Sequence, residues 1–299
     1  MSNLVVFSLL SNRKLTKRIA KKYNAELGEI SIDRFKDGEI LVKTLTSCKD
    51  KDVVIFESTA IKAHERIFEL LLLIDSIKRT GSKSVKLYIP YFGYSRQERV
   101  SWINEPISCE VVANILDTAN VDEILTFDLH HPDIEKFFKT KFTSLPTTSL
   151  FVQYYKDYLV NHNINVKDVI IVSPDHGANH RADALVKELP GSRKVILNKY
   201  RTAPNYAEHL AFEDDVKDKV CIILDDIIDT GGTIISASNL LLEHGARSVL
   251  VGASHAVLSN KSIERLLDSN IQDLVFTNTI EKRLSNRISI LDISNIIKL

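Results

Sequence analysis

The sequence predicts an α/β protein in which two successive halves each contain a parallel β-sheet. Short apolar runs rich in β-branched residues alternate with helical patterns along almost all of the 299 residues. Such alternation is typical of right-handed βαβ units, whose helices cover both faces of the sheet. The length suits two domains of ordinary size, and no low-complexity linker separates the two halves.

The first half is expected to comprise residues 1–146. Its apolar N-terminal run is followed, not preceded, by basic residues, so we interpret it as a first strand and not as a signal peptide. Further strands are expected at 52–56, 84–89 and 123–127, and helices at 64–79 and 108–118.

The second half is expected to comprise residues 147–299, because the pattern starts again near 145–149. A helix is expected at 150–160, followed by strands at 169–172, 194–197, 220–224, 248–253 and, as the last strand, 273–277. Ligands of parallel sheets bind outside the carboxyl ends of the strands. The polar segments that follow these strands are therefore the candidate sites.

Composition excludes several classes of partner. Lys and Arg together number 39 and are balanced by 39 Asp and Glu, so no bulk attraction to nucleic acid or to an anionic membrane is expected. The apolar runs are too short to span a bilayer. The three cysteines, Cys48, Cys109 and Cys221, are widely spaced and odd in number, which argues for reduced thiols in a cytoplasmic protein.

The most informative segment is residues 217–233, KDKVCIILDDIIDTGGT. A buried strand runs into two carboxylates, Asp225 and Asp226, and then into an acidic glycine turn that opens a helix. Glycines let backbone amides approach a phosphate, threonines donate hydroxyl groups, and the helix dipole favours negative charge. The pattern predicts a sugar-phosphate site in which the carboxylates accept hydrogen bonds from ribose hydroxyls or hold a metal ion. A purely structural βα turn is the alternative. The turn consists of Asp229, Thr230, Gly231, Gly232 and Thr233.

A second candidate segment, IPYFGYSRQER at residues 89–99, follows a predicted strand. It places Arg96, Gln97 and Arg99 at the carboxyl edge of the sheet, where arginine can bind phosphate and stack on a base. The interleaved aromatic residues either form an apolar wall for a ligand or pack in the core. These are Tyr91, Phe92 and Tyr94.

A third segment, RFKDGE at residues 34–39, is by itself only a hairpin turn around Asp37 and Gly38. All three segments, however, resemble ribose-phosphate diphosphokinase, and the glycine turn also resembles that of phosphoribosyltransferases. The motifs occur in that family's order from residue 34 to the helix after Thr233. The resemblance implies two α/β halves of phosphoribosyltransferase-like type, with ATP and ribose 5-phosphate as substrates. The ATP-binding residues that it implies are Phe35, Asp37, Glu39, Arg96 and Gln97.

The resemblance also implies a metal site and a catalytic loop. His130, in TFDLH, and Asp175, in SPDHG, would help to hold Mg²⁺ on the nucleotide phosphates. Lys199 and Arg201, in NKYRTAPNY, would lie on a loop that closes over the transferring diphosphoryl group. In the family the turn with Phe35 comes from a neighbouring subunit, which implies a homo-oligomer, either a hexamer or another assembly built from dimers.

The chain departs from the family pattern at several positions. Tyr200 replaces the middle arginine of the catalytic loop, and Ala178 replaces a glycine after Asp175. Basic residues of the family's regulatory phosphate site are replaced, so activity is expected to depend weakly on phosphate; the replacements are Val100, Trp102 and Asn104. Two alternatives remain open, a non-catalytic regulatory homologue and a phosphoribosyltransferase. The second would not need the first half with its own motifs.

Overall fold

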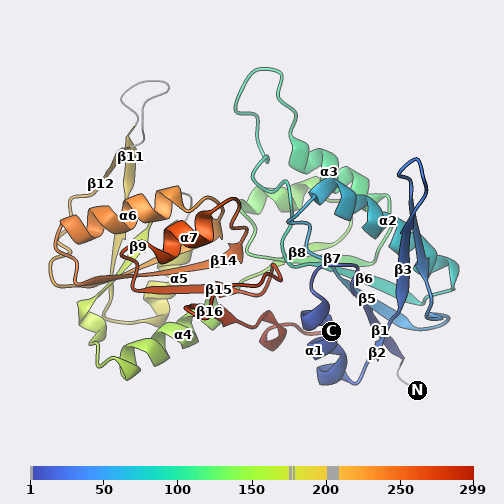
Figure 1. Ribbon diagram of the computed structural model, residues 1–299, viewed down its shortest axis with the longest axis horizontal. Helices are drawn as coiled ribbons and strands as arrows, with labels where there is room; N and C mark the ends of the chain where they lie inside the picture. The colour runs from blue at the N-terminus through green and yellow to red at the C-terminus, as the bar shows by residue number, and fades with distance from the viewer. Residues whose placement is uncertain (1–2, 175–176, 178, 201–208) are drawn as a thin grey trace. The chain divides into compact units, whose positions relative to one another are not determined.

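The protein folds into two compact units in this computed structural model (Figure 1). The structure describes residues 3–174, 177, 179–200 and 209–299, and only the backbone for 198–200, 209 and 210. The first unit contains the chain up to Leu145 together with Thr279–Glu281 and Ser294–Leu299. The second contains Pro146–Asn278 and Lys282–Ile293. The two parallel-sheet halves expected from the sequence are thus confirmed.

The first unit is built on a six-stranded parallel sheet with the order β2-β1-β5-β6-β7-β8. Its strands are β1 (Leu4–Phe7), β2 (Glu26–Leu27), β5 (Asp52–Phe56), β6 (Ser84–Ile89), β7 (Glu123–Phe127) and β8 (Phe142–Leu145). Its helices are α1 (Arg13–Tyr23), α2 (Ala63–Arg79), α3 (Ser108–Asp117) and the short 3₁₀ helix η1 (Pro132–Phe137).

Two helices of the first unit cover one face of its sheet. Leu70 and Leu73 of α2 and Leu116 of α3 are buried in one cluster with Val53 and Ile55 of β5. These side chains recur at helical spacing on α2 and at alternate positions on β5, as the apolar pattern of the sequence predicts.

An antiparallel hairpin stands beside the parallel sheet of the first unit. Its strands, β3 (Ile30–Arg34) and β4 (Ile40–Thr44), pair in register and are joined by the turn at 35–39. Gly38 has a φ of 96°, a conformation that glycine adopts without strain. Val42 packs in the same core as α2, so the hairpin is attached to its own unit through β4.

The second unit has a six-stranded parallel sheet with the order β10-β9-β13-β14-β15-β16. Its strands are β9 (Val169–Ser173), β10 (Arg193–Ile196), β13 (Val220–Ile228), β14 (Ser248–Ala256), β15 (Asp273–Thr277) and β16 (Ile288–Leu291). The strands β11 (Asn198–Tyr200) and β12 (His209–Ala211) form a separate antiparallel pair. The helices are α4 (Thr148–Asn161), α5 (Asn179–Glu188), α6 (Gly232–Glu243), α7 (Ser262–Leu267) and the 3₁₀ helices η2 (Val166–Asp168) and η3 (Ile293–Asn295).

Helices cover both faces of the second sheet. Val220, Ile222 and Leu224 of β13 pack with α4 and α5, whereas Cys221 and Ile223 pack with α6 and α7. Burial on both faces explains why β13 appears in the sequence as a continuous apolar run and not as an alternating one.

Several expectations need correction. The strand at 273–277 is not the last, because β16 follows it and pairs with it in parallel. Residues 294–299 group with the first unit, although they were expected in the second half.

The three cysteines are buried free thiols, as the sequence predicts. Among the helices of the described residues, none combines the length and the apolar character needed to cross a bilayer.

Candidate active site

The glycine turn of the second unit joins β13 to α6. The strand extends to Ile228, so Asp225 and Asp226 lie within its carboxyl-terminal half and not after its end. Gly231 is the N-cap of α6 with a φ of 78°. A Cβ atom at this position would lie 3.2 Å from the Leu266 side chain. Only glycine therefore fits the turn without strain, and the backbone amides at the start of α6 stay accessible to an anion.

The two neighbouring aspartates form an acidic pair, in which Asp226 is buried and Asp225 is partly exposed. Asp226 is 4% exposed. Burial, followed by the adjacent Asp226 carboxyl, raises the pKa of Asp225 well above its usual value. The backbone amide of Asp226 donates to Asp225 Oδ1 at 2.8 Å. The guanidinium of Arg181, from α5, lies 3.6 Å from Asp226 Oδ2 and compensates part of the negative charge.

One side chain and one backbone amide of the segment after β14 hold the turn in place. Arg265 of α7 donates to the carbonyl oxygen of Thr230 at 2.6 Å, and the amide of Ser259 donates to Asp229 Oδ1 at 3.3 Å. Lys282 lies near Asp229, and burial lowers the pKa of this lysine. Sequence reasoning missed Arg265 and Lys282, because contacts over more than 30 residues leave no local spacing pattern.

In the first unit, Arg96, Gln97 and Arg99 line one cavity of about 370 Å³. The loop is held in shape locally, since Ser108 Oγ donates to Gln97 Oε1 at 2.7 Å. Glu105 Oε2 accepts the amides of Ser101 and Trp102 at 3.1 and 3.0 Å. The structure therefore gathers the predicted arginines in one polar hollow after β6. The remaining residues that line it are Ser101, Trp102, Glu105 and Pro106.

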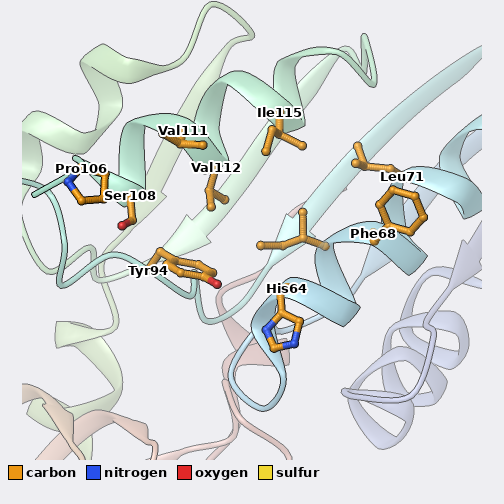
Figure 2. A pocket seen from close by; sticks show the side chains of 10 residues that line it. His64, Phe68, Leu71, Tyr94, Pro106, Ser108, Val111, Val112 and Ile115 are labelled. Atoms are coloured by element: carbon orange, nitrogen blue, oxygen red, sulfur yellow. The ribbon is translucent and has the colours of Figure 1, made fainter. Parts of the chain in front are cut away.

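The aromatic residues of this segment divide between the two roles that the sequence left open. Tyr91 and Phe92 are buried, and Phe92 packs against Phe138 with ring centroids 5.6 Å apart. They belong to the core and not to a ligand wall. Tyr94 lines a separate apolar groove of about 360 Å³ between α2 and α3, which Figure 2 shows. The other residues of this groove include Phe68, Leu71, Val111 and Ile115.

The hairpin turn presents its predicted residues to solvent. Phe35 is 55% exposed, which is unusual for an aromatic ring. The turn is closed by Phe35 N–H donating to Glu39 O at 2.9 Å, and Asp37 Oδ1 accepts the Glu39 amide at 3.1 Å. The cavity at Arg96 is lined by its own loop and does not include Phe35, Asp37 or Glu39.

His130 lies after the carboxyl end of β7 and is exposed. The preceding backbone is fixed to β8, because the amide of Asp128 donates to Leu145 O and the amide of Leu129 donates to Ser144 Oγ, both at 3.1 Å. Asp175 and Arg201 lie outside the described residues, as does the side chain of Lys199. Within the described part of the chain, no three His, Cys, Asp or Glu side chains gather as metal ligands.

Comparisons with known proteins cover nearly the whole chain. The family model described as the N-terminal domain of ribose phosphate pyrophosphokinase matches residues 4–119. The model described as the phosphoribosyl synthetase-associated domain matches residues 188–298.

Individual relatives point to the same family as the two family models. A ribose-phosphate pyrophosphokinase of Bacillus cereus is 42% identical over 279 residues, covering 93% of this chain and 86% of the relative. That of Corynebacterium ammoniagenes is 41% identical over the same shares. The crystal structure of phosphoribosylpyrophosphate synthetase from Mycobacterium smegmatis matches with a TM-score of 0.88 and 31% identity, over 99% of this chain and 96% of that one.

Proposed function

The chain belongs to the ribose-phosphate pyrophosphokinase family, called ribose-phosphate diphosphokinase above, and from this premise we propose how its residues carry out the reaction. The enzyme transfers the diphosphoryl group of ATP to the anomeric hydroxyl of ribose 5-phosphate, giving phosphoribosyl diphosphate and AMP. The hydroxyl oxygen attacks the β-phosphorus and loses its proton to solvent, while the bond from this phosphorus to the oxygen of the leaving AMP breaks. Such a transfer depends on alignment and charge neutralisation more than on covalent catalysis.

The second unit would bind ribose 5-phosphate. The observation that carries this assignment is the carboxyl pair near the end of β13, one turn away from the N-terminus of α6. Ribose hydroxyls donating to Asp225 and Asp226 would favour the ionised carboxylates and so compensate for their burial. The 5-phosphate would accept hydrogen bonds from the backbone amides and hydroxyl groups of the turn. These belong to Asp229, Thr230, Gly231, Gly232 and Thr233.

The first unit would bind ATP. Arg96 and Gln97 line a polar cavity that suits phosphate or a base edge, and the exposed ring of Phe35 offers a stacking surface for adenine. Asp37 and Glu39, on the same turn, supply acceptors for the nucleotide. Because the turn residues do not line the cavity at Arg96, a turn supplied by a neighbouring subunit is compatible with this arrangement.

Mg²⁺ is the cofactor that we propose, held by His130 and Asp175 together with phosphate oxygens of ATP. One or two protein ligands are enough, because Mg²⁺ commonly keeps several waters and binds substrate phosphates. When bound, it would neutralise charge on the transferring group. Lys199 and Arg201 would act as the catalytic cations, stabilising the charge that develops at the β-phosphate.

We propose a homo-oligomer, either a hexamer or an assembly built from dimers, and a cytoplasmic location. The exposed apolar groove between α2 and α3 supports self-association. The three cysteines, all free thiols, agree with a reducing compartment.

The decisive experiment follows AMP formation from ATP, Mg²⁺ and ribose 5-phosphate. We expect Asp225→Asn to raise the KM for ribose 5-phosphate about tenfold or more, because it removes a negatively charged hydrogen-bond acceptor. The KM for ATP should change less than about twofold. Asp273→Asn is the matched control, since Asp273 is a partly buried acid of the same unit that accepts a hydrogen bond from Tyr154 at 3.0 Å, outside the site.

Two results would contradict the proposal. If Asp225→Asn weakened only the binding of ATP, this pocket would not be the sugar site. If the wild-type protein formed no AMP, the non-catalytic homologue would be the better description of this chain.

A further inference from the structure

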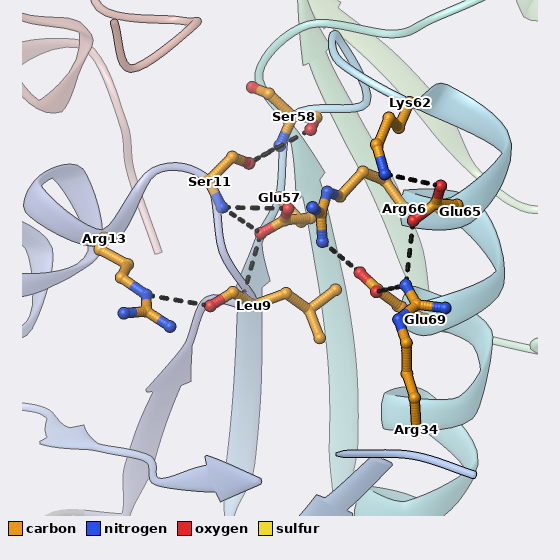
Figure 3. Close-up of polar contacts among 10 residues, drawn as sticks. All are labelled: Leu9, Ser11, Arg13, Arg34, Glu57, Ser58, Lys62, Glu65, Arg66 and Glu69. Carbon is orange, nitrogen blue, oxygen red and sulfur yellow. Dashed lines mark hydrogen bonds and ion pairs between the residues drawn. The ribbon is translucent and has the colours of Figure 1, made fainter. Parts of the chain in front are cut away.

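The first unit contains a cluster of acidic and basic side chains, of which only Arg34 belongs to one of the sequence motifs. Figure 3 shows it between the hairpin, α2 and the carboxyl end of β5. Two of its acids are deeply buried: Glu57 is 0% exposed and Glu69 is 1% exposed. A buried carboxylate is costly unless it is paired, so each must be accounted for by its partners.

Glu69, in the middle of α2, is held on both carboxylate oxygens. Its Oε2 pairs with the guanidinium of Arg66, one helical turn earlier. Its Oε1 accepts from Arg34 Nη2 at 3.2 Å. Glu69 therefore joins its own helix to a residue of the hairpin, which lies 35 positions away in the sequence.

Arg34 is the last residue of β3 and directly precedes the exposed turn at 35–39. It also donates to Glu65 at 2.9 Å, but Glu65 is partly exposed and shares its charge with Lys62 at 3.0 Å. Exposed pairs of this kind contribute little. The buried Glu69 is the stronger of the two anchors, because its carboxylate has few alternative partners.

The hairpin is anchored to α2 at a second place, far from the turn. The amide of Thr44, at the end of β4, donates to Ser76 Oγ at 3.0 Å. Helix α2 thus holds the hairpin at its base through Ser76 and next to its turn through Glu69.

The same cluster reaches the carboxyl edge of the sheet. Arg66 also lies close to Glu57, whose carboxylate accepts the amides of Leu9 at 3.0 Å and Ser11 at 3.2 Å. The positive charge of Arg66 therefore acts on two buried carboxyl groups, those of Glu57 and Glu69.

We propose that Glu69 is a positioning residue for the nucleotide, because through Arg34 it fixes the turn that carries Phe35, Asp37 and Glu39. The inference rests on the proposed role of this turn in binding ATP. Without the contact between Glu69 and Arg34, the polar contacts that hold the hairpin on α2 would be the one at its base, through Ser76, and the partly exposed pair of Arg34 with Glu65. Binding of ATP would then have to order the turn, and ordering a segment on binding lowers affinity.

The test compares two neutralised acids that contact the same guanidinium from the same helix. We expect Glu69→Gln to raise the KM for ATP about tenfold, the size of one hydrogen bond to a charged group. The KM for ribose 5-phosphate should stay within about twofold. Glu65→Gln should change both constants less than about twofold, because its carboxylate is partly exposed and shares its charge with Lys62. A larger effect of Glu65→Gln than of Glu69→Gln on ATP would overturn the inference.

Arg34→Met removes the same contact without altering the core, and it keeps the inference testable if Glu69→Gln folds poorly. It should raise the KM for ATP as Glu69→Gln does, and the double variant should be no worse than the more affected single variant. Faster hydrogen exchange of the amides at 30–44, with unchanged exchange in β5 and β6, should accompany the change. If the increases in the KM for ATP multiplied in the double variant, Arg34 and Glu69 would act independently, and this would contradict the proposal.

Phe35→Ala separates this inference from the proposed function. If it raises the KM for ATP while Arg34→Met and Glu69→Gln do not, the turn binds ATP but Glu69 does not position it. If none of the three variants changes the KM for ATP, the assignment of the turn to the nucleotide is wrong, and the inference fails with it.

Discussion

At the scale of single residues, Glu57 makes the stability of the protein depend on pH. Burial raises the pKa of Glu57 from 4.5 to about 7, and hydrogen bonds from Ser11 and the charge of Arg66 offset only part of this effect. Between these two pH values the unfolded chain releases a proton that the folded chain keeps. Folding stability is therefore present below about pH 4.5 and is lost as the pH rises to about 7.

We expect this loss to amount to about 3 kcal/mol, because each pKa unit between 4.5 and about 7 corresponds to about 1.4 kcal/mol. Glu57→Gln cannot ionise and should lack this part of the pH dependence. Urea unfolding of both proteins at pH 4.5 and pH 8 measures it, because the other titrating groups cancel in the comparison. Parallel pH profiles for the two proteins would show that Glu57 does not titrate in this range.

Sequence reasoning identified residues with a local pattern and missed those defined by distant partners. The pair Asp225 and Asp226 was found because it stands between an apolar strand and a glycine turn. Glu57 and Glu69 carry no such mark, since their partners Leu9 and Arg34 are 48 and 35 positions away in the sequence. The spacing of Glu65 and Glu69 on α2 resembles that of any solvated helix face.

At the scale of elements, the entry into α6 depends on Gly231. Its φ of 78° strains any other residue, and an added Cβ would lie 3.2 Å from Leu266. We expect Gly231→Ala to lower the free energy of unfolding by about 1–2 kcal/mol and to raise the KM for ribose 5-phosphate. Chemical denaturation and steady-state kinetics measure the two effects.

Gly232→Ala is the control for stability, because a Cβ there would meet only Thr230 Oγ1, at 3.9 Å. It should be neutral or stabilising, since alanine is the better helix former. If both variants had the same stability, the strain assigned to Gly231 would be absent.

Long elements with strong periodicity could be predicted from the sequence, whereas short or polar ones could not. Strands β6 and β7 have the expected bounds, and α2 and α3 differ from expectation by one residue at one end. The two-residue strand β2, the polar strand β8 and the basic helix α1 were missed. Helix α1 buries only Leu15, Thr16 and Ile19, so its apolar stripe is short, and most of its other residues are basic.

At the scale of the whole molecule, the C-terminal segment returns to the first unit. Lys22 Nζ donates to Ser294 O at 2.7 Å, Tyr23 OH donates to Ile297 O at 2.8 Å, and Tyr88 OH donates to Lys298 O at 2.8 Å. All three acceptors are backbone carbonyls, which every residue possesses. No residue pattern could therefore predict that residues 294–299 leave the second unit, although the two-sheet architecture was evident from the alternation of strands and helices.

The assembly of the molecule is expected to depend on the apolar groove between α2 and α3. Phe68 is 55% exposed and Val111 is 52% exposed, and both line this groove (Figure 2). In a homo-oligomer that buries the groove, a carboxylate placed there would lose its hydration without gaining a partner. We therefore expect Phe68→Glu and Val111→Glu to weaken self-association about thirtyfold or more, which corresponds to about 2 kcal/mol.

Sedimentation velocity over a range of protein concentrations measures this shift towards smaller species. Val160→Glu is the matched control, because Val160 is an even more exposed aliphatic residue, at 76%, and lies on α4 of the second unit, outside the groove. It should leave the mass distribution unchanged. Dissociation by Val160→Glu but not by Phe68→Glu would place the subunit contact on the second unit. A wild-type protein that sediments as a monomer at all concentrations would contradict the homo-oligomer itself.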